Sequence, residues 1–169
     1  MLIGILADTH IQSHHIKKNA YRKIVEQLHE LFKEVDHIIH AGDVCTLQFL
    51  RDLETIAPVT YCRGNCDRNL PGPSKQEITL ETVSIGIAHF PENISAFDPD
   101  AIQVFIHGHT HFPSIKETDK GILVVCPGSL LNPRPRTSHF LFKEDSTPRP
   151  SVAFINIIED QVSAIIKKL

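Results

Sequence analysis

The sequence of 169 residues has no strong excess of charge of either sign, because 17 lysines and arginines stand against 20 acidic residues, for a net charge of −3. Lys and Arg are scattered rather than clustered, so we expect no general attraction for nucleic acid or for anionic lipid. The sequence also lacks an apolar run near the ~18 residues that a membrane span needs, and we expect no membrane partner. No basic segment precedes the first apolar residues, which therefore do not resemble a signal peptide.

Cysteine is scarce. The four cysteines are irregularly spaced in a chain long enough to build a core without disulfides, which favours reduced thiols and a cytoplasmic location. Cys45, Cys62 and Cys126 are interpreted as small core residues. The composition, 41% hydrophobic and 22% charged, is typical of a globular protein, and the length predicts one domain over residues 1–169.

The first half of the chain predicts alternating strands and helices. Three apolar runs predict strands, and two segments with apolar residues every three or four positions predict helices. Because each crossover runs to ten or twenty residues, the strands should be parallel with right-handed connections. In chain order these elements are a strand at 2–7, a helix at 16–35, a strand with its exit loop at 37–44, a helix at 47–56 and a strand with its loop at 59–67.

The second half contains four strand-like runs, which predict a second, largely antiparallel sheet packed against the first. The last two runs fold about turn signals at 119–121 and 159–160. The proline-rich segment 133–150 is interpreted as a long loop, with a short strand at 139–142 left open. The four runs are 77–90, 103–111, 114–129 and 151–168.

Five polar clusters each follow one of these strands. Parallel strands bring the residues past their carboxyl ends to one edge of the sheet, where open α/β sheets bind ligands. Asp, His and Asn side chains suit divalent first-row metals, and their number is too large for one ion. We therefore predict two ions that share a carboxylate. The clusters are Asp8-Thr9-His10, Gly42-Asp43, Gly64-Asn65-Cys66-Asp67, His89 and Gly108-His109-Thr110-His111.

Each cluster alone also has an ordinary structural interpretation. Asp8 could cap a helix, and Gly42-Asp43 and Gly64-Asn65 could be turn dipeptides. His89 could be a hydrogen-bonded interior histidine. The two histidines of Gly-His-Thr-His are the hardest to explain by packing. Together the structural interpretations are poor, because five clusters would have to end five strands by coincidence.

In the order D-x-H, G-D, G-N-x-D, H and G-H-x-H, the chain resembles the calcineurin-like metallophosphoesterases, in particular their small single-domain prokaryotic phosphodiesterases. The resemblance runs from Leu2 to about Ile158 and implies an α/β fold, a four-layer α/β/β/α sandwich of two facing mixed β-sheets. It implies two divalent ions, manganese first, with nickel, zinc or iron as alternatives. One ion would be held by Asp8, His10, Asp43 and His111, and the other by Asp43, Asn65, His89 and His109.

The same resemblance implies a metal-dependent phosphodiesterase acting on a small phosphate ester. Two cations roughly 3.5–4 Å apart can share a water and clamp both the attacking and the leaving oxygen at phosphorus, so a bridging hydroxide would be the nucleophile. The implied catalytic residues are Asp43, Asn65 and Cys66. The implied substrate-binding residues are Asn65, Cys66 and an arginine, Arg136 or Arg134, after the Pro127-Gly128-Ser129 turn.

Two positions depart from the common family pattern. Many members have histidine where this chain has Cys66, although the small prokaryotic branch commonly has cysteine. A thiol with a pKa of about 8.5 is a poorer proton donor near neutrality than imidazolium, which predicts a preference for diesters or aryl esters with good leaving groups. His89 is followed by Phe90 instead of glycine, and Phe90 is a candidate wall of the substrate pocket. Residues 91–101 are short for the helix usually found there.

Other functions stay open. The same fold occurs as a non-catalytic retromer subunit that binds proteins, and a phosphomonoesterase would use the same metal site. Nucleic acid is expected only as a phosphodiester substrate, and a homodimer could pair through the C-terminal strands. His14, His15 and His139 are candidates to contact substrate phosphate. His37 and His40 are interpreted as structural.

Overall fold

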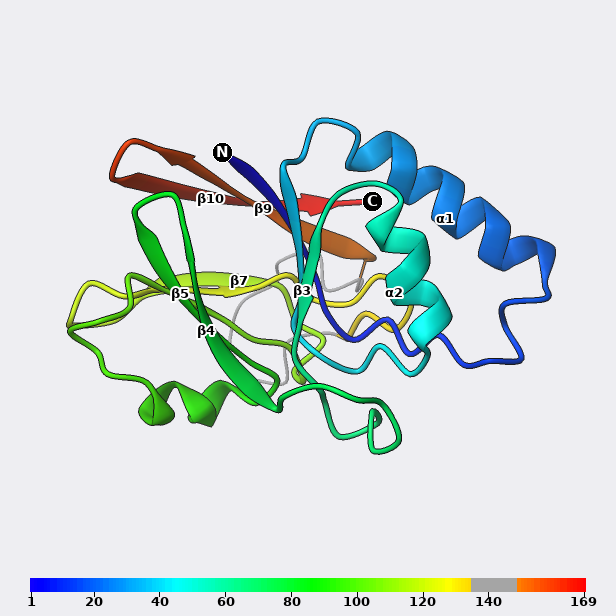
Figure 1. Ribbon diagram of the computed structural model, residues 1–169, viewed down its shortest axis with the longest axis horizontal. Helices are drawn as coiled ribbons and strands as arrows, with labels where there is room; N and C mark the ends of the chain where they lie inside the picture. Colours follow the sequence, from blue (N-terminus) through cyan, green and yellow to red (C-terminus); the bar gives the residue numbers. More distant parts are fainter. Residues whose placement is uncertain (135–148) are drawn as a thin grey trace, which may run out of the picture.

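The computed structural model describes residues 1–134 and 149–169, and its elements follow an order close to the predicted one (Figure 1). None of the helices in these two ranges is long and apolar enough to cross a membrane. The elements are β1 (Leu2–Leu6), α1 (Asn19–Leu31), β2 (His37–His40), α2 (Leu47–Glu54), β3 (Val59–Tyr61), β4 (Lys75–Leu80), β5 (Val83–Ala88), the 3₁₀ helix η1 (Pro91–Ala96), β6 (Val104–Ile106), β7 (Ser114–Glu117), β8 (Leu123–Cys126), β9 (Ser151–Ile158) and β10 (Gln161–Lys168).

Two five-stranded sheets form the framework. The first has the order β10-β9-β1-β2-β3, in which β1, β2 and β3 are parallel and β9 and β10 are antiparallel to their neighbours. The second has the order β4-β5-β6-β8-β7, in which β5, β6 and β8 are parallel and the outer strands are antiparallel. The predicted pair of mixed sheets is therefore confirmed.

The prediction that residues 151–168 join the second sheet is wrong. They form the expected hairpin, but β9 pairs with β1, with Ile3 opposite Ile155, and so extends the first sheet. The prediction that the second sheet is largely antiparallel is also wrong, because β6 is parallel to both of its neighbours. A strand's own sequence indicates its type but not its partner, which depends on distant residues that bury the same apolar surface.

Several element boundaries also differ from the sequence prediction. The run 77–90 is a hairpin of two strands, β4 and β5, which turns at Glu81, a residue with φ of 52°. This turn lacks the Gly or Asn that usually marks such a bend, so the sequence gives no sign of it. Helix α1 begins at Asn19 rather than at residue 16, after a series of turns, and its N-cap residue Lys18 makes no side-chain cap hydrogen bond.

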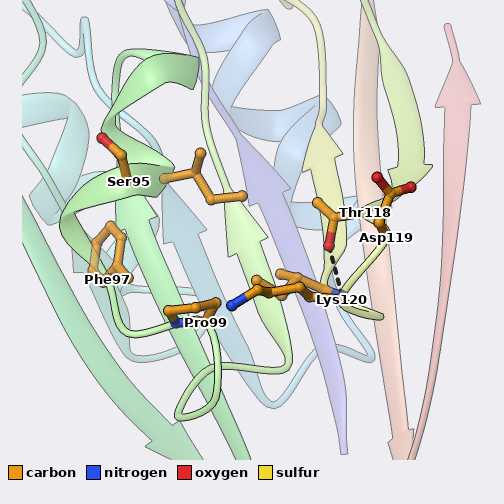
Figure 2. Close-up of a pocket in the computed structure, with 8 residues that line it drawn as sticks. Ser95, Phe97, Pro99, Thr118, Asp119 and Lys120 are labelled. Carbon is orange, nitrogen blue, oxygen red and sulfur yellow. Dashed lines mark hydrogen bonds between the residues drawn. The ribbon is translucent and has the colours of Figure 1, made fainter.

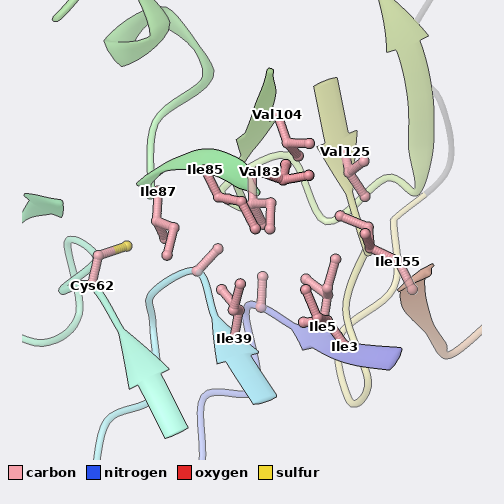
Figure 3. Packing of buried hydrophobic residues seen from close by; sticks show 14 of the residues in the cluster. Ile3, Ile5, Ile39, Cys62, Val83, Ile85, Ile87, Val104, Val125 and Ile155 are labelled. Atoms are coloured by element: carbon pink, nitrogen blue, oxygen red, sulfur yellow. The ribbon is translucent and has the colours of Figure 1, made fainter. Parts of the chain in front are cut away.

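The main core lies between the two sheets (Figure 3). Side chains alternate along β1, so that Ile3 and Ile5 face the second sheet while Leu6 faces the helices. This double burial explains the nearly continuous apolar run at the start of the chain. The labelled members of the core from the other strands and the loop after β3 are Ile39, Cys62, Val83, Ile85, Ile87, Val104, Val125 and Ile155.

Helices cover the outer faces of the sandwich unequally. Helices α1 and α2 pack on the first sheet through an apolar layer that includes Phe32 and Phe49 (Figure 1). On the second sheet, the short η1 and the residues after it contribute Ile94 and Phe97, which pack against the cluster of Phe105. The fourth layer is thus a 3₁₀ helix, in keeping with the short segment 91–101. The sheets are held face to face, with the carboxyl ends of β1, β2, β3, β5 and β6 at one edge.

Candidate metal centre

The loops after these five strands bring the predicted ligand residues together. Strands β1, β2 and β3 are parallel to one another in the first sheet, and β5 and β6 are parallel in the second, so within each sheet their exit loops emerge on the same side. Polar atoms from the first sheet lie within 3.1 to 3.9 Å of histidines from the second. The residues that converge are Asp8, His10, Asp43, Asn65, His89, His109 and His111.

The backbone of this edge is unusual. Five of the candidate ligands adopt left-handed backbone conformations, with φ of 52° at Asp8, 50° at His10, 57° at Asp43, 67° at His109 and 58° at His111. This region costs a non-glycine residue roughly 1–2 kcal/mol. Such strain concentrates at functional sites, where the surrounding structure holds it in place. Here it turns the chain sharply after each strand.

One group of ligand atoms surrounds a first candidate position. Nε2 of His10 lies 3.2 Å from Nε2 of His111, which is itself 3.4 Å from Oδ1 of Asp8. Nδ1 of His111 lies 2.6 Å from the carbonyl oxygen of Asn132, to which it donates a hydrogen bond. That bond fixes the proton on Nδ1 and leaves the Nε2 lone pair for a cation.

A second group lies beside the first. Oδ1 of Asn65 is 3.1 Å from Nε2 of His89 and 3.2 Å from Nδ1 of His109. Nδ1 of His89 lies 2.9 Å from the carbonyl oxygen of Ala41, so this imidazole too directs Nε2 toward the centre. Two nitrogens and one amide oxygen therefore face one another, as the ligands of a second cation would.

Asp43 lies between the two groups. Its Oδ2 is 3.6 Å from Nε2 of His10 and 3.5 Å from Nε2 of His89. Its Oδ1 accepts a hydrogen bond of 2.8 Å from the backbone N–H of Cys66, which fixes the orientation of the carboxylate. A carboxylate in this position could contact ions in both groups.

The environment of the Asp8 carboxylate indicates whether the candidate ligands fit a cation. Its side chain is completely buried, and neither carboxyl oxygen has a hydrogen-bond partner. Burial raises the pKa of Asp8 from 3.8 to about 7. An ionised carboxylate without a partner is costly to bury, and a divalent cation would supply the missing charge and the missing bonds. The donor set therefore fits metal ions.

The pKa values of the other candidate ligands are shifted in different directions. Burial lowers the pKa of His10 and of His111, which favours the neutral imidazoles that bind metals. Burial would raise the pKa of Asp43, but hydrogen bonds from His89 and from the Cys66 backbone bring it below its ordinary value. Burial likewise pulls the pKa of His89 down, yet its hydrogen bond to Asp43 raises it overall. Asp43 is thus a carboxylate near neutral pH.

Two glycines are needed for the close approach of the loops. A Cβ atom at Gly64 would collide with Oδ1 of Asp43, and one at Gly42, whose φ is +91°, would lie 2.6 Å from Nδ1 of His89. The dipeptides Gly42-Asp43 and Gly64-Asn65 are therefore more than ordinary turns. The glycines make room for the candidate ligands Asp43 and His89 on the adjoining elements.

Sequence reasoning missed two residues that brace the centre. The buried carboxylate of Asp67 accepts hydrogen bonds from the backbone N–H groups of Val44, Cys45 and Gly64, at 3.2, 2.7 and 2.8 Å, and so joins the loops after β2 and β3. Ser129 donates a hydrogen bond of 2.7 Å to the carbonyl oxygen of Asp8. A single Asp or Ser in a loop has no periodic signal. The positions of Asp67 in G-N-x-D and of Ser129 in Pro-Gly-Ser were the available hints.

The residues expected around the substrate have mixed outcomes. Cys66 is exposed at the rim of the centre, and the ring of Phe90 packs 4.5 Å from that of His109, measured between centroids. Arg134 is exposed, and its backbone N–H donates to the carbonyl oxygen of His111 at 3.3 Å. Arg136, His139 and the strand suggested at 139–142 lie outside the described residues.

Four further histidines that the sequence analysis named lie outside the candidate centre. His14 and His15 contact each other, with ring centroids 4.1 Å apart, and His15 accepts a hydrogen bond from the backbone N–H of Gln12. The two histidines interpreted as structural each bond to a threonine, as structural residues would: His37 to Thr60 and His40 to Thr9.

All four cysteines are free thiols, and Cys62 and Cys126 are buried as expected. The placement of Cys45 in the core is wrong, because it is half-buried beside His10. The tight left-handed turn at Cys45, with φ of 70°, directs it toward the loops rather than into the core.

A cavity of about 430 Å³ lies elsewhere, between η1 and the turn that joins β7 to β8 (Figure 2). Ser95, Phe97 and Pro99 form one side of it. Thr118, Asp119 and Lys120 form the other, where Oγ1 of Thr118 accepts a hydrogen bond of 3.1 Å from the Ile122 backbone N–H. Within residues 1–134 and 149–169, the groups of side chains that could hold a metal all lie at the sheet edge and not in this cavity.

Known proteins resemble this chain in sequence and in fold. A "Probable metallophosphoesterase" of Methanothermobacter thermautotrophicus is 34% identical over 145 residues, which span 79% of this chain and 80% of that protein. An archaeal phosphodiesterase shares the fold with a TM-score of 0.71 at 20% identity, over 99% of this chain and 100% of the other. Vps29 of Entamoeba histolytica, solved with zinc, does so with a TM-score of 0.71 at 18% identity, over 100% and 98%.

These two structural similarities are too distant in sequence to show more than the fold. The match to the family model is more specific, because it extends from residue 1 to residue 146 and includes every strand-end cluster described above. The chain belongs to the calcineurin-like phosphoesterase superfamily.

Proposed function

We propose that this protein is a phosphodiesterase that depends on two divalent cations, manganese first. Membership of the superfamily supports phosphoester hydrolysis. The observation that carries the proposal is the position of Asp43, whose Oδ2 lies 3.6 Å from Nε2 of His10 and 3.5 Å from Nε2 of His89. One carboxylate oxygen thus serves two groups of ligands.

The two groups divide the proposed ligands between the ions. Asp43 belongs to both sets, and Asp8 contributes a buried carboxylate whose oxygens have no hydrogen-bond partner. When bound, two such ions would supply positive charge for the phosphoryl oxygens. They would also lower the pKa of a bound water, so that hydroxide is available near neutral pH to attack phosphorus. The proposed sets are Asp8, His10, Asp43 and His111 for one ion and Asp43, Asn65, His89 and His109 for the other.

Residues at the rim would act on the substrate. Although Cys66 is an exposed residue, partial desolvation of its thiol together with the negative charge of Asp43 raises the pKa of the thiol above its ordinary value, so the thiol keeps its proton near neutrality. We propose that it donates weakly to the leaving oxygen, which favours diesters and aryl esters. Asn65 would orient the substrate, and the arginine would be Arg134 or Arg136. Phe90, packed on His109, would form a wall of the pocket.

The experiment is hydrolysis of bis-p-nitrophenyl phosphate by the full chain, with added Mn²⁺ and with a chelator. We expect turnover that needs the metal. Replacement Asp43→Asn should lower it by at least about 10²–10³-fold, because it removes the shared charge at the centre. Asp119→Asn, the same change at the β7–β8 turn, should leave turnover unaltered.

The fold that the chain shares with Vps29 keeps open the alternative given by the sequence, a non-catalytic protein that binds other proteins. The complete set of candidate ligands in this chain favours the enzyme. Absence of metal-dependent turnover on both bis-p-nitrophenyl phosphate and p-nitrophenyl phosphate would favour the binding protein. A higher kcat/KM on the monoester than on the diester would instead make the protein a phosphomonoesterase.

The proposed role of Cys66 has its own test. Cys66→Ala should reduce turnover of an alkyl diester more than turnover of an aryl ester, by up to about 10²-fold, because an alkoxide needs a proton donor and a nitrophenolate does not. If both substrates were turned over by the variant as by the wild type, Cys66 would have no acid role.

A further inference from the structure

A second cluster of potential metal ligands, which includes two thiols, adjoins the candidate centre. The thiols of Cys45 and Cys66 and a ring nitrogen of His10 all lie within 4.8 Å of one another. They come from the loops after β2, β3 and β1, the same loops that provide the candidate ligands of the first sheet. Cys45 belongs to neither proposed ligand set.

The two nitrogens of His10 face different groups. Nε2 lies 3.2 Å from Nε2 of His111 and 3.6 Å from Oδ2 of Asp43, in the candidate metal centre. Nδ1 lies 3.9 Å from the sulfur of Cys45. The imidazole therefore separates a nitrogen and oxygen environment on one side from a sulfur environment on the other.

We propose that Cys45, Cys66 and Nδ1 of His10 form a separate site for a thiophilic divalent cation such as Zn²⁺. Two thiolates and one imidazole are a donor set typical of zinc, with water as the fourth ligand. Sulfur donors also select zinc over manganese, which prefers oxygen and nitrogen. Tetrahedral zinc would hold these donors about 3.5–4 Å apart. The sulfur of Cys45 and Nδ1 of His10 already lie 3.9 Å apart, and the three donors lie within 4.8 Å of one another.

Binding at this thiol site is a simple exchange. The cation takes one lone pair from each sulfur and one from Nδ1, and both thiol protons pass to solvent. The proton of the neutral imidazole then resides on Nε2. An Nε2 that carries a proton has no lone pair to donate, so His10 cannot serve the candidate centre at the same time.

The thiol site and the candidate centre should therefore be antagonists. Zinc at the thiol site removes one ligand from the proposed manganese pair. By thermodynamic linkage, manganese at the centre weakens zinc binding at the thiol site by the same factor. This antagonism rests on the proposed function, whereas the existence of the thiol site does not.

Cobalt titration of the reduced, metal-free full chain tests the site directly. Co²⁺ bound to thiolate gives a near-ultraviolet sulfur-to-metal charge-transfer band, which nitrogen and oxygen ligands do not. We expect this band in the wild type and its displacement by zinc. It should disappear in Cys45→Ser and in Cys66→Ser, and persist in the control Cys62→Ala, which removes a core thiol. Circular dichroism and thermal melting establish that each variant is folded.

The result that overturns the proposal is absence of the band in the wild type, or an unchanged band in folded Cys45→Ser.

A second measurement addresses the antagonism. Zinc should inhibit manganese-dependent hydrolysis of bis-p-nitrophenyl phosphate, and Cys45→Ser should keep this hydrolysis while it raises the inhibition constant for zinc at least about tenfold. Equal inhibition of the variant and the wild type would contradict the antagonism. If the protein hydrolyses neither ester, the proposed function fails, and the cobalt titration still decides on the thiol site.

Discussion

Ser129 supports two candidate ligands, although it would bind no ion itself. Its hydroxyl donates to the Asp8 carbonyl at 2.7 Å and accepts from the Asn132 backbone N–H at 2.9 Å. The Asn132 carbonyl in turn accepts from Nδ1 of His111. One buried hydroxyl thus fixes the orientation of ligands from both sheets.

Ser129→Ala should weaken manganese binding by about 10–100-fold, the usual effect of removing support from metal ligands. The measurement is calorimetric titration of the metal-free protein. Ser151→Ala is the matched control, because Ser151 is equally buried but donates to the carbonyl of Pro127. Similar losses of affinity in the two variants would contradict a specific role for Ser129.

Asp8 should couple the stability of the metal-free protein to pH. Burial raises its pKa from 3.8 to about 7, so between these values the folded state keeps a proton that the unfolded state has lost. The free energy of unfolding that Asp8 contributes therefore falls as pH rises from about 4 to about 7. It stays low at higher pH.

Urea unfolding in chelator at pH 5 and pH 8 tests this coupling, with Asp8→Asn as the reference. The wild type should lose stability relative to the variant as pH rises, because asparagine has no charge to bury. Added Mn²⁺ should restore the stability of the wild type at pH 8, since the cation binds the ionised carboxylate of Asp8. A constant difference between the two proteins at both pH values would argue against the raised pKa.

At the scale of the elements, the loop after β3 can reach the loop after β2 because Gly64 has no side chain. A Cβ atom there would collide with Asp43, so Gly64→Ala should displace this carboxylate. A displacement near 1 Å commonly lowers a rate by about 10²-fold, and we expect at least this loss of metal-dependent turnover.

Gly121→Ala is the control for Gly64→Ala. Gly121 also tolerates no side chain easily, because its φ is +78°, but a Cβ atom at this position in the β7–β8 turn would meet only Oε1 of Glu117, at an ordinary contact distance of 3.9 Å. The control should lose roughly 1–2 kcal/mol of stability and keep its turnover. Thermal melting and turnover are measured on both variants. Equal turnover by Gly64→Ala and Gly121→Ala would show that the loops after β2 and β3 adjust to the added methyl group.

At the scale of the whole molecule, the centre depends on how the two sheets face each other. Asp8, Asp43 and Asn65 come from the first sheet, and the other sheet provides His89 and His109. Since the core between the sheets fixes this relation (Figure 3), damage to the core should affect stability and metal binding together.

Truncation of a core isoleucine, Ile39, can be compared with truncation of an exposed one, Ile165. Ile39→Ala should cost about 2–5 kcal/mol, because Ile39 is 0% exposed in the central core. Ile165→Ala should change stability by no more than about 0.5 kcal/mol, because Ile165 is 61% exposed on β10. Chemical denaturation measures both, and equal costs would contradict the assignment of the core.

Strand β10 is also the outer strand of the first sheet, and it exposes Ile165 there. An outer strand with free backbone groups can pair with a second copy. The homodimer through the C-terminal strands stays a prediction, which the molar mass in solution would check.

The sequence by itself determined which residues end the strands and what chemistry they could support. The period of apolar side chains and the spacing of Asp8 and His10 or of His109 and His111 are local properties, which are present before the chain folds. The parallel order of the first three strands follows from the lengths of their connections.

Only the tertiary structure decided the partners and the orientations. It paired β9 with β1, placed Cys45 beside His10 and gave Asp43 a position between two groups of histidines. Partner choice depends on apolar surface that distant segments bury together, and the direction of a loop side chain depends on backbone angles that packing imposes. Neither quantity is encoded in a local stretch of sequence, and for that physical reason only the folded chain reveals the arrangement of the centre.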